Sequence, residues 1–170
     1  MNRKPPLSSK ALLHLLLFSA FTFVLVILAV RFLTTLLESG LLTWFDIQFI
    51  YSPFSVLFAS TETGNWNVNK ILAAYGGIPV LLFVVGLANL YLKSKHWKVN
   101  LALTWLSFFL VNSLPLNILA GVFLFQGFGI AYQWLLPHLT LRIGLAIPAL
   151  ALMLWSRPFW IQRFMRCAYS

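Results

Sequence analysis

Residues 11–30 read ALLHLLLFSAFTFVLVILAV, twenty consecutive residues without a Lys, Arg, Asp or Glu. As a helix they would extend about 30 Å, which is the thickness of the hydrocarbon core of a bilayer. The apolar core of a signal peptide is shorter, at about 7–15 residues, and is followed by a small-residue cleavage site. No good cleavage site follows here. The stretch therefore predicts a first transmembrane helix, which we extend over residues 11–37.

The composition assigns the rest of the chain to the membrane as well. Of the 170 residues, 61% are hydrophobic and 9% are charged, whereas ordinary globular domains have about 45–50% and about 25%. So few charges cannot build a water-facing surface, and a disordered chain needs low hydrophobicity and high charge. Both classes are excluded. The length leaves room for one domain with at most about six crossings.

The apolar segments predict an all-α fold: an integral membrane protein with about four transmembrane helices and one or two interfacial or re-entrant segments. In chain order we expect a basic tail (1–10), a first crossing (11–37), an extracytoplasmic or interfacial segment (38–69), a second crossing (70–92), a cytoplasmic loop (93–98), a broken third crossing with a re-entrant part (99–136), a fourth crossing (139–156) and a basic tail (157–170).

The basic residues predict the orientation. Three Lys or Arg residues lie in each of the segments 1–10, 93–98 and 157–170, and such clusters favour the cytoplasmic side of a membrane. Both termini are therefore expected in the cytoplasm, with the protein in a bacterial inner (plasma) membrane. The clusters lie beside apolar segments, as contact with anionic lipid on the cytoplasmic face requires, so nucleic acid is not expected as a partner.

All three acids of the chain fall in residues 38–69, which are expected on the opposite face. This arrangement requires that residues 41–59 do not cross the membrane. Asp46 would be costly at the centre of a crossing, and Pro53 would free a backbone carbonyl. We therefore expect residues 41–59 to lie along the interface or to dip into it.

The third crossing contains a predicted helix break at Asn112, Ser113 and Pro115. Pro115 has no N–H and clashes with the carbonyl four residues earlier. Asn112, Ser113 and Asn117 could satisfy the freed backbone groups, which lipid cannot do. In the second crossing, Ala73 and Gly77 are four residues apart and form a small-xxx-small pattern that permits close helix approach.

Two sets of side chains are candidate sites. Arg31, Glu38, Asp46 and Arg142 could form a polar cluster at the outer face that binds an anionic headgroup or a substrate, and the alternative is independent snorkelling of each side chain. His14 and His138 are weak candidates for binding a pigment, a haem or a metal, and the alternative is an interfacial imidazole solvated by headgroups. No cofactor is predicted, and no metal or catalytic set is found.

Two short motifs resemble those of the site-two intramembrane metalloproteases. Residues 112–115 followed by Ala120 and Gly121 resemble the Asn-x-x-Pro…Asp-Gly element of that family, and residues 73–79 are similar to its Gly-Pro helix start. The family's His-Glu-x-x-His is absent, and Ala120 stands where a ligand aspartate is expected. Without ligands or a base there is no hydrolysis, so the resemblance implies an inert relative.

The leading functional hypothesis is a non-catalytic accessory or assembly subunit of a larger membrane protein complex, with other integral membrane subunits or a second copy as partners. Its apolar surface exceeds what four helices can bury. The alternative is a small oligomeric transporter or lipid-handling protein that uses the broken helix. A pigment- or haem-binding subunit and an inert protease relative are lesser alternatives.

Overall fold

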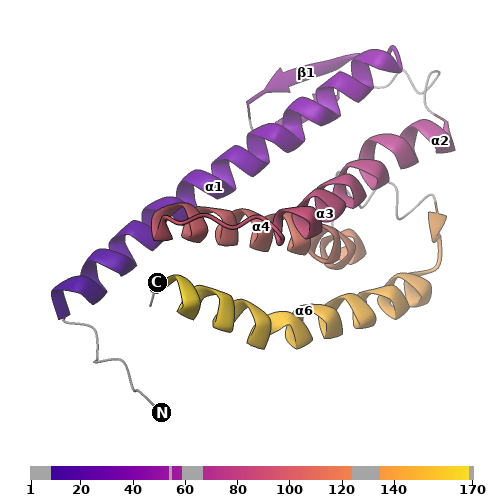
Figure 1. Ribbon diagram of the computed structural model, residues 1–170. Coiled ribbons are helices and arrows are strands. Elements are labelled where there is room, and N and C mark those ends of the chain that lie inside the picture. The colour runs from indigo at the N-terminus through magenta and orange to yellow at the C-terminus, as the bar shows by residue number, and fades with distance from the viewer. Residues whose placement is uncertain (1–8, 54, 59–66, 124–134, 169–170) are drawn as a thin grey trace.

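The computed structural model describes residues 9–53, 55–58, 67–123 and 135–168, and it is mostly helical (Figure 1). In chain order the elements are α1 (Ser9–Trp44), β1 (Phe49–Ser52), β2 (Ser55–Phe58), α2 (Val68–Ile71), the π-helix η2 (Leu72–Gly77), α3 (Ile78–Asn89), α4 (Trp97–Phe123) and α6 (Leu139–Ala168). Most of the predicted N-terminal tail, residues 59–66 of the predicted interfacial segment and residues 124–134 of the predicted re-entrant part lie outside the described residues.

The prediction of four membrane-length helices is confirmed. Within the described ranges, four helices are long and apolar enough to cross a membrane: Leu12–Trp44, Val68–Asn89, Trp97–Val122 and Leu139–Cys167. The second of these is α2, η2 and α3 in one continuous run. With 36 and 30 residues, α1 and α6 extend about 54 and 45 Å, more than the hydrocarbon core requires.

Helix α4 lies in the middle of the bundle and packs against α1, α3 and α6 (Figure 1). Helices α3 and α4 approach each other closely at Gly86 of α3. A Cβ there would lie 2.7 Å from the Cβ of Leu110 and 2.7 Å from the backbone nitrogen of Val111. Gly77, in the predicted small-xxx-small pattern, has no other described element within 4 Å of such a Cβ. The tight contact between these helices therefore lies at Gly86 and not at Gly77.

Residues 41–59 do not form a spanning helix, as predicted. Helix α1 continues to Trp44, a turn follows, and β1 and β2 then pair as an antiparallel hairpin with Ser52 opposite Ser55. The hairpin departs from the all-α prediction. The two short antiparallel strands satisfy each other's backbone groups locally.

The second spanning helix contains one π-helical stretch, η2. The π-helical stretch is explained by Pro79 in the first turn of α3. Pro79 has no N–H to donate to the carbonyl of Tyr75, four residues earlier. The wider turn before Pro79 avoids the clash between the proline ring and that carbonyl. Short π-helical stretches of this kind are frequent at functional sites.

The predicted helix break at Pro115 is wrong, because α4 runs without interruption from Trp97 to Phe123. The neighbouring amides satisfy carbonyls of the same helix. Asn112 donates to the carbonyl of Phe108 at 2.7 Å, and Asn117 donates to that of Ser113 at 2.7 Å. One lost backbone hydrogen bond is therefore compatible with a continuous helix.

Candidate functional site

The end of the bundle that carries β1, β2 and the end of α1 is called the hairpin end. Helix α1 stops there in a Schellman motif. The N–H of Ile47 donates to the carbonyl of Leu42 at 3.0 Å, and the N–H of Asp46 donates to that of Thr43 at 3.1 Å. Asp46 has a φ of +56°, a conformation more usual for Gly. The predicted polar residue Asp46 is thus the residue that ends α1.

A lysine from α2 caps the same helix end. The Lys70 ammonium donates to the carbonyl of Phe45 at 2.9 Å, and a cation is favourable at the negative end of a helix dipole. The backbone N–H of Lys70 is in turn held by the side chain of Asn67 at 2.8 Å. The start of the second spanning helix is therefore fixed to the end of the first.

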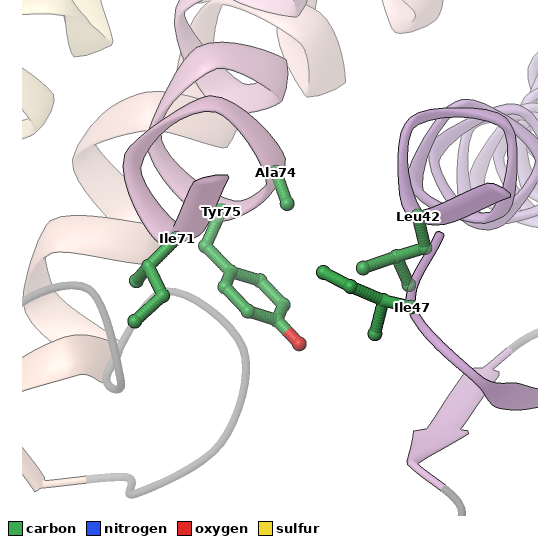
Figure 2. Packing of buried hydrophobic residues seen from close by; sticks show 5 residues of the cluster. All are labelled: Leu42, Ile47, Ile71, Ala74 and Tyr75. Carbon is green, nitrogen blue, oxygen red and sulfur yellow. The ribbon is translucent and has the colours of Figure 1, made fainter. Parts of the chain in front are cut away.

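Buried side chains complete this junction. Figure 2 shows Tyr75 of η2 pointing across toward Leu42 and Ile47, with Ile71 and Ala74 beside it. Leu42 and Ala74 are fully buried. The five residues join the end of α1 to the π-helical turn in one apolar cluster.

Glu38 lies on α1 one turn before Leu42 and is half-buried. Arg31 lies two turns earlier on a similar face of the same helix. Arg31 is exposed. Of the four residues predicted to form an outer polar cluster, Arg31 and Glu38 share one face of α1, and the cluster itself stays a prediction.

Arg142 has other partners. Its guanidinium donates to the carbonyls of Leu136 at 2.7 Å and Pro137 at 3.2 Å, which lie just before α6 begins. Arg142 therefore fixes the entry of the chain into α6.

The two histidine candidates are both exposed and lie at different ends of the bundle. His14 is near the start of α1, and His138 immediately precedes α6. Across the described parts of the chain, no group of three His, Cys, Asp or Glu residues could hold a metal ion. The structure therefore does not bring His14 and His138 to one depth.

The opposite end, called the basic end, comprises the start of α1, residues 93–98 and the end of α6. A polar junction of α3, α4 and α6 lies there. Asn89 donates to the hydroxyl of Ser107 at 2.8 Å and to the carbonyl of Leu103 at 3.1 Å. Arg163 donates to the carbonyl of Leu90 at 3.1 Å. Asn89 is an amide inside the apolar run 70–92, and such residues are expected to face other helices.

Aromatic rings extend this junction toward α1. The Trp105 ring lies 4.4 Å from that of Phe164 in α6 and 5.0 Å from that of Phe23 in α1. Its indole N–H donates to the hydroxyl of Ser19 at 3.1 Å. Trp105 is the tryptophan that lies well inside an apolar run, a position that could have identified it as a contact between helices.

Comparisons with protein-family models, curated proteins and solved structures give no match. The resemblance to site-two metalloproteases therefore depends on its short motifs alone, and the geometry described above is what supports a functional proposal.

Proposed function

We propose that the chain is a non-catalytic accessory or assembly subunit of a larger membrane protein complex, embedded in a bacterial inner membrane with both termini in the cytoplasm. The four apolar helices support membrane embedding. The orientation is supported by the basic end, where Lys98 lies 5.5 Å from the Phe18 ring and Arg163 bonds to Leu90. Lys10, residues 93–98 and the end of α6 lie at this end, as one cytoplasmic face requires.

Helices α1 and α6 leave most of their apolar surface uncovered. In the most apolar window of α6 only 6% of residues are buried, and in that of α1 only 11%, against 39% in the helix Val68–Asn89. Helix α6 packs mainly on α4. Its remaining faces are available to lipid or to another protein.

Gly144 of α6 is the observation that favours another protein. A glycine inside a helix is less favourable than alanine by about 1 kcal/mol. The close contact with α4 explains why a glycine is needed at Gly86. A Cβ at Gly144, in contrast, would meet nothing within 4 Å in the described parts of this chain. Pro148 and Ala151 are also exposed on that face. Small residues in register let the backbone of a second helix approach closely.

The transporter alternative is less well supported, because α4 is continuous through Pro115 as far as Phe123. Asn112 and Asn117, which would have lined the predicted helix break, are bonded to carbonyls of their own helix.

The test is a comparison of Gly144→Leu with Ala88→Leu, an exposed position on α3 that carries no proposed contact. After mild detergent extraction, the amount of intact complex is measured on a native gel. We expect Gly144→Leu to reduce the complex several-fold at an unchanged level of folded chain, while Ala88→Leu has no effect. An unchanged complex with Gly144→Leu would contradict the proposal, and an intact complex with loss of a solute flux would favour the transporter.

A further inference from the structure

One stripe of α1 passes from an exposed to a covered environment near the hairpin end. Arg31 and Glu38 are seven residues apart on this stripe. Their directions around the helix axis therefore differ by about 20°, and their positions along the axis differ by about 10.5 Å. Arg31 is exposed and Glu38 is half-buried. On the same stripe, Thr35 is 3% and Leu42 is 0% exposed. The covering elements therefore begin just beyond Arg31.

The neighbours of Arg31 are apolar and exposed. Leu28, Phe32 and Leu33 are each more than 40% exposed, so in a membrane this part of α1 faces acyl chains. A guanidinium in that position extends its long side chain toward the nearest headgroups. The anions available there are lipid phosphates, to which Arg can donate two parallel hydrogen bonds.

Glu38 lies farther from the middle of α1 than Arg31, toward the hairpin end. In an aminophospholipid the phosphate is attached next to the glycerol and acyl chains, and the ammonium follows it. The order of charges along α1, cation first and then carboxylate, is thus complementary to the order of charges in that headgroup.

We propose that Arg31 and Glu38 bind a zwitterionic phospholipid with a primary amine, of the phosphatidylethanolamine class, in the leaflet at the hairpin end. Arg31 binds the phosphate and Glu38 accepts hydrogen bonds from the ammonium. A choline headgroup offers no N–H to Glu38, and a glycerol headgroup offers no cation. This site is separate from the α6 surface in the proposed function and does not depend on it.

The test is native mass spectrometry of the purified chain with equal concentrations of phosphatidylethanolamine, phosphatidylcholine and phosphatidylglycerol. We expect about tenfold tighter retention of phosphatidylethanolamine than of the other two, which corresponds to about 1.4 kcal/mol. Glu38→Gln should abolish this preference, and Arg31→Gln should weaken the binding of all three lipids. Arg157→Gln, an exposed arginine of α6, is the charge-matched control and should leave the preference for phosphatidylethanolamine over phosphatidylcholine unchanged.

Four results would overturn the proposal. Tighter binding of phosphatidylglycerol, increased further by Glu38→Gln, would indicate an anionic-lipid site. Equal retention of the three lipids by the wild-type chain would show no headgroup selection, and this result needs no variant to fold. Displacement of the lipid by an equal concentration of soluble phosphoethanolamine would indicate a water-soluble ligand. A preserved lipid preference in a folded Glu38→Gln chain would exclude that carboxylate.

Discussion

Asp46 shows how one residue fixes the hairpin end. Among the described non-glycine residues it is the one with a positive φ, and an L-residue in the left-handed region is less favourable by about 1–2 kcal/mol. We expect Asp46→Gly to raise the free energy of unfolding by about 1 kcal/mol, and Asp46→Val to lower it because a β-branched side chain fits this conformation poorly. Thermal unfolding in detergent measures both. Equal stabilities of the two variants would show that α1 does not end in this motif.

Gly86 gives the second prediction at the scale of a residue. Gly86→Ala places a Cβ 2.7 Å from backbone and side-chain atoms of α4, so the two helices must separate. Overpacking of this kind destabilises by about 1–3 kcal/mol. Gly144→Ala is the matched control, and it should be neutral or stabilising by up to about 1 kcal/mol, because open space surrounds that position in the isolated chain. Denaturation of the purified chain distinguishes the two, and a neutral Gly86→Ala would contradict the close approach.

At the scale of the element, Arg163 and Lys70 play matching roles at opposite ends of the bundle. Each donates to a carbonyl at the C-terminal end of a distant helix, Arg163 to Leu90 after α3 and Lys70 to Phe45 after α1. Those carbonyls have no partner within their own helices. Two basic residues thus link elements that are far apart in the sequence.

We expect Arg163→Met to lower the free energy of unfolding by about 1.5 kcal/mol, because a hydrogen bond to a charged group is lost. The end of α6 should also loosen from α4, with a change in the fluorescence of Trp105 and Trp160. Arg166→Met, an exposed position three residues later, should change neither quantity. Equal effects of the two variants would mean that charge alone, and not the bond to Leu90, accounts for the result.

The elements could be predicted where a long apolar run defines them. The run at residues 11–30 predicted a first helix over 11–37. The helix continues to Trp44, because it ends only at Asp46 and is capped there by Lys70, which is distant in the sequence. The hairpin could not be predicted, since two four-residue strands carry no periodic signal. Pro115 predicted a break, but one missing backbone hydrogen bond within a 27-residue helix that packs against α1, α3 and α6 does not interrupt it.

At the scale of the whole molecule, the sequence predicted which residues share a face of one helix, but it did not predict which residues of different helices are in contact. Arg31 and Glu38 could be placed on one helix face from their seven-residue separation, and both lie in α1. Arg142 could not be assigned, because its carbonyl partners belong to the turn before α6. Asn89 of α3 bonds to Leu103 and Ser107 of α4, which are 14 and 18 positions later in the sequence. Only the packing of the two helices brings these residues together.

The orientation of the whole bundle is tested by cysteine accessibility on a Cys167→Ser background. Cys167 is buried beside Thr104, and serine can replace it there. A cysteine at Ser94, in the basic end, should react with an impermeant reagent only after the cytoplasmic face is opened. A cysteine at Gln48, exposed at the hairpin end, should react in intact cells. Reversed labelling would contradict the orientation and would place the lipid site in the other leaflet.

The central claim is that the chain acts by contact with other membrane subunits. The most direct measurement is the native mass of the chain after gentle detergent extraction, with identification of every co-migrating protein. We expect a species well above 19.3 kDa that contains at least one other integral membrane protein in fixed ratio, and whose amount falls in the Gly144→Leu variant. A monomer, or an oligomer of this chain alone that is unchanged by Gly144→Leu, would contradict the claim.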